Sequence, residues 1–441
     1  MRCDIPAREA MSRYAVRYFA TIAGMLIGFR LNNFRCFMTE QTFSFAASPD
    51  RTHEATHLMR TGLKSVPKLS KAAIVFGPNA SGKSNLLIGL RTLQTLMLHS
   101  TDQPDAQFAE LYTPFRFGPA AGRPTEFELD LLLGSVRYRY ALSYDAQRIR
   151  SERLLVYRTG KSQRWFERRF DDSVQREEWA PFSPSFNGPR EIWRKATRPS
   201  ALFLTTAARL NSEQLAPLLK WAEQSLRVLG PVEIGDFDRV SARLRDRHFK
   251  GRLIRLLRAS GIEIEDVRVA EAAAVPPGET TPDGGHQRHG GARPCIEFLY
   301  NRPGWAPVWA DSVFESAGVH RLMSLFVPVA EAIDDGKVLL IDEFDTSLHP
   351  LIARFLIQLV SNPEVSDKGS QLLMTSHNIT LMDLDILRRD QIWLMHIDEH
   401  HASVLTSLVR ASPRKNEMIA KNYLKGRYSA IPDVRPKLFD R

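Results

Sequence analysis

The chain of 441 residues predicts an α/β fold in which a mixed β-sheet is interrupted by inserted material. Three observations predict it. An apolar run at 72–76 leads into a glycine-rich loop and then into a helix-like pattern. A second apolar run, at 338–341, ends in two carboxylates. Between them, residues 125–144 alternate as paired antiparallel strands do. We therefore expect a mixed-sheet α/β domain with an antiparallel β subdomain and a helical insertion.

Composition limits the partners of this fold. The net charge of +10 makes a polyanion, DNA or RNA, one candidate partner. The three cysteines are scattered and form neither a disulfide framework nor a zinc pattern, which favours a reducing, cytoplasmic setting. No apolar run approaches membrane-spanning length, so we expect no membrane partner.

Patterning also divides the chain. Residues 25–31 predict the first strand, and the polar residues 171–200 predict a loop. Residues 274–293 are rich in Pro, Gly and Thr. The expected divisions are an N-terminal extension at 1–24, an N-terminal part with the glycine-rich loop and the β subdomain at 25–200, a helical insertion at 201–273, a flexible loop at 274–293, a C-terminal part of the sheet domain at 294–412 and a tail at 413–441.

The glycine-rich loop, residues 77–84 (GPNASGKS), matches G-x-x-x-x-G-K-[ST]. Such a loop turns backbone N–H groups toward an anion, and the helix that follows adds its positive end. Lys83 would reach the β- and γ-phosphates of ATP and take part in catalysis, and the Ser84 hydroxyl would bind Mg²⁺. A chance glycine turn is the alternative, which the flanking strand and helix disfavour. The expected nucleotide contacts of this segment are Gly77, Asn79, Ala80, Ser81, Gly82, Lys83, Ser84 and Asn85.

The two carboxylates, Asp342 and Glu343, follow a fully apolar strand. In an open α/β sheet, ligands bind at the carboxyl ends of the strands. Asp342 would hold Mg²⁺ opposite Ser84, mostly through water, and Glu343 would orient or deprotonate the attacking water. The alternative is a strand that ends in two solvated acids.

Two further segments carry less information alone. Residues 315–321 (ESAGVHR) place Ser316 as a helix N-cap, and Gly318 lets backbone approach an anion. Residues 375–378 (TSHN) place His377 beyond a strand, where it could contact a γ-phosphate. Taken singly, the first would be a plain helix start and the second a structural histidine.

In combination and order, these motifs resemble the ABC-type ATPase heads of SMC and RecF proteins. Among them, the chain looks most similar to stand-alone bacterial ATPases of the RloA and abortive-infection AbiL type. The resemblance covers about residues 25–433 and is carried by the segments MLIGFRLNNFRCF, VFGPNASGKSN, ESAGVHRL, LLIDEFDTSLHP, TSHN and YLKGRYSAIP.

The resemblance implies a homodimer, or a higher homo-oligomer, with ATP and Mg²⁺ held between two heads. Ser316 and Gly318 would form the signature that faces the other subunit's nucleotide. Asp345 would lie in the D-loop, His377 would be the catalytic switch histidine, and Arg35 would lie near the nucleotide. A Q-loop glutamine has no clear position, and the signature is not the transporter sequence LSGGQ.

Three functions stay open. The first is an ATP-hydrolysing, nucleotide-gated sensor or regulator of a partner effector, a nuclease or toxin, in anti-phage defence, as the resemblance implies. The second is a RecF/SMC-like DNA-repair ATPase, and the third is a non-hydrolysing ATP-dependent scaffold. Lys83 and Glu343 together count against the scaffold. The arginine-rich residues 243–258 could bind nucleic acid, form a solvated face or pair with acids of a second subunit.

Overall fold

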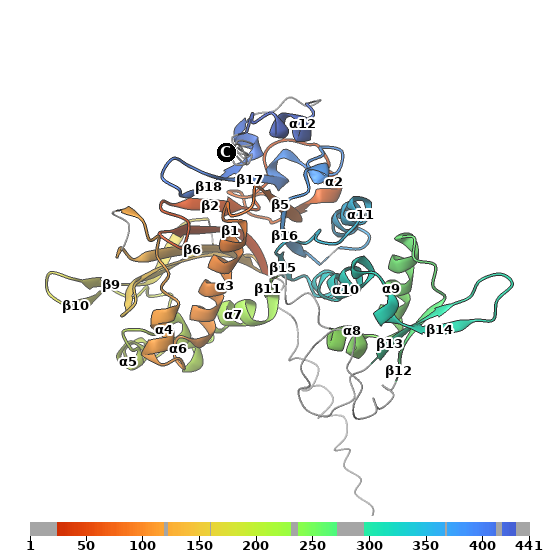
Figure 1. Ribbon diagram of the computed structural model, residues 1–441. Coiled ribbons are helices and arrows are strands. Elements are labelled where there is room, and N and C mark those ends of the chain that lie inside the picture. Colours follow the sequence, from red (N-terminus) through yellow and green to blue (C-terminus); the bar gives the residue numbers. More distant parts are fainter. Residues whose placement is uncertain are drawn as a thin grey trace, which may run out of the picture.

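The computed structural model describes residues 24–118, 122–158, 160–230, 237–270, 295–366, 368–411 and 417–428. Two large β-sheets form its centre, and a smaller lobe lies to one side (Figure 1). The expected N-terminal extension, apart from Gly24, and the expected flexible loop at 274–293 lie outside the described residues.

The first large sheet is the antiparallel β subdomain. Its strand order is β10-β9-β8-β7-β6-β1-β2, and every neighbouring pair runs antiparallel. The strands are β1 (Gly24–Asn32), β2 (Gln41–Ser44), β6 (Thr125–Leu133), β7 (Val136–Tyr144), β8 (Ile149–Tyr157), β9 (Ser162–Asp171) and β10 (Arg176–Trp179). The alternation read from the sequence is present in β7, where Tyr138 and Tyr140 are buried. A separate pair, β3 (Leu58–Arg60) and β4 (Lys68–Ser70), completes this half.

The second large sheet is mixed, as predicted. Its order is β11-β15-β16-β5-β17-β18, parallel throughout except for the last pair. The strands are β5 (Ala72–Phe76), β11 (Leu226–Leu229), β15 (Val338–Ile341), β16 (Gln371–Ser376), β17 (Ile392–Ile397) and β18 (Ser403–Ser407). The fold is therefore the α/β, P-loop type with a mixed sheet that the sequence predicts.

This mixed sheet separates two hydrophobic cores. Because successive side chains of a strand point to opposite faces, Ala73 and Val75 of β5 enter one core, while Ile74 and Phe76 enter the other. The first core is shared with α3 (Lys83–His99) and the antiparallel sheet, and the second with α10 (Ala317–Asp335) and α11 (Pro350–Ser361). Figure 1 shows α3 on one side of the strands and α10 and α11 on the other.

The side lobe lies between β11 and α10 in the chain. It consists of α8 (Phe237–Arg243), α9 (Arg247–Ala259) and a three-stranded antiparallel sheet of β12 (Asp266–Ala270), β13 (Cys295–Tyr300) and β14 (Val308–Asp311). The apolar face of α9, including Phe249 and Leu253, packs in the same core as Val267 and Phe298 of this sheet.

Two secondary-structure expectations were wrong in detail. The expected helical insertion at 201–273 contains β11, a strand that pairs with β15 along the edge of the mixed sheet. The segment 171–200, read as loop, contains β10 and α5 (Arg190–Ala196). The helix α10 runs from Ala317 to Asp335 with Pro328 inside it. The other helices are α2 (Glu54–His57), α4 (Asp105–Glu110), α6 (Phe203–Arg209), α7 (Ala216–Lys220) and α12 (Ile419–Leu424).

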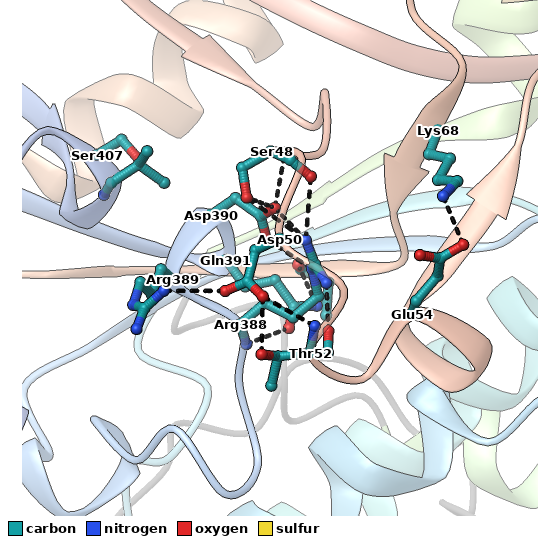
Figure 2. Close-up of polar contacts among 12 residues, drawn as sticks. Ser48, Asp50, Thr52, Glu54, Lys68, Arg388, Arg389, Asp390, Gln391 and Ser407 are labelled. Atoms are coloured by element: carbon teal, nitrogen blue, oxygen red, sulfur yellow. Dashed lines mark hydrogen bonds and ion pairs between the residues drawn. The ribbon is translucent and has the colours of Figure 1, made fainter. Parts of the chain in front are cut away.

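A buried polar network fastens residues 48–52 to the start of β17 (Figure 2). The Arg388 guanidinium donates from Nε to Asp390 Oδ1 (2.9 Å) and from a terminal nitrogen to Oδ2 (2.7 Å), and neither side chain is more than 5% exposed. Asp390 Oδ2 also accepts from the Ser48 amide (2.7 Å) and hydroxyl (2.8 Å), and Arg388 donates to the Thr52 carbonyl. The ion pair is thus fully enclosed and well bonded.

Within the described ranges, no helix has both the length and the apolar character needed to cross a membrane.

Candidate nucleotide-binding site

The glycine-rich loop leaves the carboxyl end of β5 and enters α3 in a conformation that only small residues permit. A Cβ on Gly77 would lie 2.3 Å from the Met395 carbonyl oxygen. Gly82 has φ +103°, and its Cβ would lie 2.4 Å from Ser403 Oγ. Ala80 also has a positive φ, +61°. These contacts explain the two glycines of the motif, because a side chain at Gly77 would collide with Met395 of β17 and one at Gly82 with Ser403 of β18.

Lys83 lies at the first turn of α3 with only 5% of its surface exposed. Its Nζ donates to the carbonyl oxygens of Gly77 (2.9 Å) and Pro78 (2.8 Å) and lies 3.4 Å from His377 Nδ1. Burial lowers the pKa of Lys83 to about 8, and the nearby carboxylates, Asp342 first, oppose that shift. The ammonium group is therefore held inside the loop, close to the acids of the second motif.

Asp342 and Glu343 follow β15. In the mixed sheet, β16 lies between β15 and β5. The Thr375 hydroxyl, near the end of β16, donates to Asp342 Oδ1 at 2.5 Å. The same hydroxyl accepts the Glu343 backbone N–H at 2.8 Å. Asp342 is 7% exposed, whereas the side chain of Glu343 is 38% exposed. One acid is thus fixed inside the sheet edge, and the other reaches toward solvent.

Ser376, the last residue of β16, and His377, which follows it, continue these contacts. Ser376 Oγ donates to Asp345 Oδ2 at 2.9 Å, and burial raises the pKa of Asp345. His377 stands between the two motifs, since its Nε2 is 3.7 Å from Glu343 Oε1 and its Nδ1 faces Lys83. The structure therefore gathers Lys83, Asp342, Glu343, Asp345 and His377 around the end of one strand.

The signature residues form the start of α10. Ser316 is the N-cap, and its hydroxyl accepts the Val319 N–H at 3.4 Å. A Cβ on Gly318 would lie 2.9 Å from the Ser347 carbonyl, so the signature packs directly on the loop after Asp345. In the described part of the chain, no hydrogen bond or ion pair joins Ser316 or Gly318 to residues 77–84. The structure does not bring these two groups together within one chain.

Arg321, one turn into α10, was not foreseen from the sequence. It is 9% exposed and donates from a terminal nitrogen to the Glu343 carbonyl at 2.6 Å. Burial lowers its pKa, and the carboxylates of Glu343 and Asp345 oppose that effect. The helix that starts with the signature is therefore bonded to the backbone of an acid in the same chain.

Arg35 lies at the entrance of α3. Its terminal nitrogen donates to Asn85 Oδ1 at 3.3 Å, and Asn85 Nδ2 contacts Cys36 Sγ at 3.1 Å. Arg35 has φ +48° and is exposed. Its guanidinium group is thus tethered beside the loop and open to solvent.

The residues present fit a triphosphate with a divalent cation. Ser81 Oγ is buried without a hydrogen-bond partner in the described residues, inside a loop whose glycines leave room for backbone alone. Asp342 Oδ2 has no donor among the described residues, so one carboxylate oxygen remains for a cation. Ser84 is half-buried in the first turn of α3. Hydroxyl and carboxylate oxygens are the ligands that Mg²⁺ prefers.

Thr375 and Ser376 belong to the TSHN segment, but nothing in the sequence alone assigns them a role. The sequence feature that could have pointed to these two residues is a pair of small polar side chains at the end of a fully buried strand, directly before His377. Only the pairing of β16 with both β15 and β5 shows that these hydroxyls reach the acids.

Residues 72–383, more than half of the chain, match the protein family described as "AAA domain, putative AbiEii toxin, Type IV TA system". The chain belongs to this family. It thus contains an AAA domain, in agreement with the loop and strand geometry above. A comparison with curated proteins finds no match for this AAA-domain chain.

Solved structures similar to this AAA-domain protein include the SMC head domain from Thermotoga maritima, with 15% identity, a TM-score of 0.39 and coverage of 87% of this chain and 98% of that one. An SMC head bound to the C-terminal winged-helix domain of ScpA gives 14% identity, a TM-score of 0.40 and coverage of 88% and 99%. An SMC head with an extended coiled coil, bound to the C-terminal domain of ScpA from Pyrococcus furiosus, gives 13%, 0.39 and coverage of 88% and 98%. At such values, these likenesses say nothing of this chain's activity or partners.

Proposed function

We propose that this protein binds ATP with Mg²⁺ and hydrolyses it in a site built around the end of β16. The observation that carries the proposal is the gathering of the loop lysine, the acid pair and the histidine there: Lys83 Nζ lies 3.4 Å from His377, whose other nitrogen lies 3.7 Å from Glu343. A hydrolysing phosphate site needs a cation on the β- and γ-phosphates beside a group that activates water.

The roles follow from burial and exposure. Lys83, now bonded to two loop carbonyls, would exchange them for phosphate oxygens. Asp342 and Ser84 would hold Mg²⁺, which neutralises the charge that develops on the phosphates. Glu343, the more exposed acid, would orient or deprotonate water, and His377 would hydrogen-bond the γ-phosphate. Gly77, Asn79, Ala80, Ser81, Gly82, Asn85 and Arg35 would contact the nucleotide.

We further propose that the site is completed by a second copy of the chain. Ser316 is exposed, and the two residues that precede the signature segment expose large apolar surfaces: Val313 is 60% exposed and Phe314 83%. Such a surface beside Ser316 and Gly318 suits a partner that brings its own nucleotide. Asp345, which is bonded to Ser376 next to the signature loop, would face the same boundary. ATP would then join two heads, and hydrolysis would release them.

A nucleotide-gated dimer of this kind would act as a switch for a partner effector, a nuclease or toxin, in anti-phage defence in the cytoplasm. The family description, a toxin of a type IV toxin–antitoxin system, supports a defence role over DNA repair. The RloA or AbiL type is our proposal for the subgroup. A scaffold that binds ATP without hydrolysis is disfavoured by the acid–histidine contact.

A nucleic-acid partner has one specific observation in its favour. Arg245, Arg247 and Arg255, at or near the start of α9 and along it, are exposed and have no ion pair among the described residues. Their neighbours Lys250 and Arg252 are instead neutralised by acids at 2.8 Å and 2.6 Å. The exposed arginines could therefore contact a phosphate backbone.

The test combines ATP turnover with measurement of mass in solution. We expect Lys83→Ala to abolish ATP binding, and Glu343→Gln to bind ATP, remain dimeric and lose turnover by about 100-fold or more. Lys64→Ala, on an exposed loop residue, is the control and should behave as wild type. Equal phosphate release by wild type and Glu343→Gln would refute hydrolysis at this site.

Mixing two inactive variants tests the shared site directly. Lys83→Ala and Ser316→Arg homodimers should each be inactive. In a mixed dimer, one site would combine both defects and the other would be intact, so random mixing should restore about a quarter of the wild-type rate. Absence of any recovery, with mixed dimers shown to form, would contradict the two-chain site.

A further inference from the structure

Residues 375 and 376 of β16 contact four consecutive residues of the acid loop. The Thr375 hydroxyl bonds Asp342 and the Glu343 N–H, and the Thr375 carbonyl accepts the Phe344 N–H at 3.2 Å. Ser376 then bonds Asp345. Since β16 is paired in parallel on both sides, with β15 and with β5, it cannot shift without moving both motifs. The end of β16 is thus the rigid reference for the acid loop.

We propose that Thr375 is a positioning residue: its hydroxyl holds Asp342 Oδ1 so that Oδ2 is left for the metal, and it fixes the backbone from which Glu343 acts. The inference rests on the proposed function and adds a residue to it. Thr375 itself is fully buried and would touch neither nucleotide nor metal.

The direction of the hydrogen bonds follows from simple donor counting. The Glu343 backbone N–H can only donate, so Thr375 Oγ1 is its acceptor. The single hydroxyl proton then goes to the remaining neighbour, Asp342 Oδ1, at 2.5 Å. This arrangement occupies Oδ1 of Asp342 and leaves Oδ2 for the cation.

The backbone at Glu343 is held as well as its side-chain neighbour Asp342. Glu343 has φ +48°, in the left-handed region that residues with a side chain rarely adopt. Its N–H is held by Thr375, and its carbonyl is held by Arg321 at 2.6 Å. Both peptide groups of a strained residue are thus anchored, and strain of this kind persists only where surrounding contacts impose it. Removing the hydroxyl would leave the Glu343 N–H buried without its acceptor.

A purely structural threonine is the competing explanation, and a matched pair of variants separates the two. Thr375→Val keeps the shape and removes the hydroxyl, while Thr375→Ser keeps the hydroxyl. Thr205→Val is the control. Thr205, in α6, is also fully buried, and its hydroxyl donates to the Met97 carbonyl at 2.6 Å. A general effect of losing a buried hydroxyl would appear in both valine variants.

The readouts are binding of a fluorescent ATP analogue in EDTA, Mn²⁺ binding to the protein–nucleotide complex by electron paramagnetic resonance, and phosphate release. Thr375→Val should bind nucleotide in EDTA like wild type, because the loop is intact. Its Mn²⁺ affinity and kcat should each fall about 10- to 100-fold, the usual range for residues that orient metal ligands. Thr375→Ser should recover both to within about threefold, and Thr205→Val should change neither.

Each outcome has one meaning. Wild type that binds no nucleotide overturns the proposed function. Wild type that binds and hydrolyses ATP, with Thr375→Val matching Thr205→Val, overturns the positioning role alone. If Thr375→Val fails to fold, Thr375→Cys replaces the hydroxyl by a weak donor and should lower Mn²⁺ affinity to an intermediate value; wild-type affinity in that variant would equally overturn the inference.

Discussion

The buried ion pair beside β17 allows a stability prediction with a stated size. Replacing Asp390 by Asn keeps the side-chain shape but removes the charge that four donors converge on: two from Arg388 and two from Ser48. The Arg388 guanidinium, 0% exposed, would remain buried with only neutral partners such as the Thr52 carbonyl. Leaving one partner of a buried pair uncompensated costs about 3–5 kcal/mol. We expect Asp390→Asn to lower the free energy of unfolding by about 3 kcal/mol, the lower end, because Asn can still accept a hydrogen bond.

The neighbouring residue supplies the control. Arg389 pairs with Asp50 at 3.0 Å, but both side chains are about one-quarter exposed (24% and 26%). Because water screens such a pair, Arg389→Gln should cost less than about 1 kcal/mol. Urea unfolding followed by tryptophan fluorescence measures both variants. The double variant Arg388→Met, Asp390→Leu should cost less than the sum of its single changes, since no charge is then left buried.

Equal losses of stability in Asp390→Asn and Arg389→Gln would refute an enclosed ion pair at Arg388. So would a double variant as unstable as its two single changes added together. Either result would mean that water reaches Arg388 in the folded chain.

Three other expectations follow from the same structure. Gly82→Ala should abolish binding of the fluorescent ATP analogue, because its Cβ would meet Ser403 Oγ at 2.4 Å, whereas Gly62→Ala, also at positive φ but in open space, should leave binding unchanged; equal binding by both would contradict the loop geometry. His57 Nε2 donates to the Ile386 carbonyl at 3.0 Å, and burial lowers the pKa of His57 to about 4. As pH falls, His57 therefore takes up a proton in the unfolded chain before it does so in the folded chain. Stability should therefore fall between pH 6.5 and about 4 by at most about 3 kcal/mol, and a His57→Gln variant should lose that part of the slope in urea unfolding; an unchanged slope would refute it. Chelating Mg²⁺ with EDTA should stop phosphate release while the analogue still binds, and turnover in EDTA would exclude the proposed metal role.

The sequence predicted the elements whose pattern is local. The apolar runs at 72–76 and 338–341 became β5 and β15 with the expected bounds, because a short run of buried residues flanked by turn residues has few alternatives in an α/β chain. The loop and the acid pair were found because their spacing is fixed by the phosphate that they fit. Their roles remain predictions that the experiments above address.

What the sequence could not show depends on distant partners. β11 has four residues directly after a helical turn, and it is a strand because β15 pairs with it and because Gln94 donates to the Leu226 carbonyl at 2.9 Å. Likewise, Arg321 looks like any residue of a helix until α10 is placed against β15. Thr375 gains a role only when β16 lies between two motifs that are far apart in the chain.

The helix α10 presents Ser316 outward while Arg321, five residues later, holds the backbone of an acid in its own chain. If the phosphate of a nucleotide bound to a neighbouring copy contacted Ser316, a shift of α10 would also move the Glu343 backbone, which belongs to the other site of the same dimer. Closure of the dimer at one site would then also act on the acid loop of the other site, while each site could still turn over by itself.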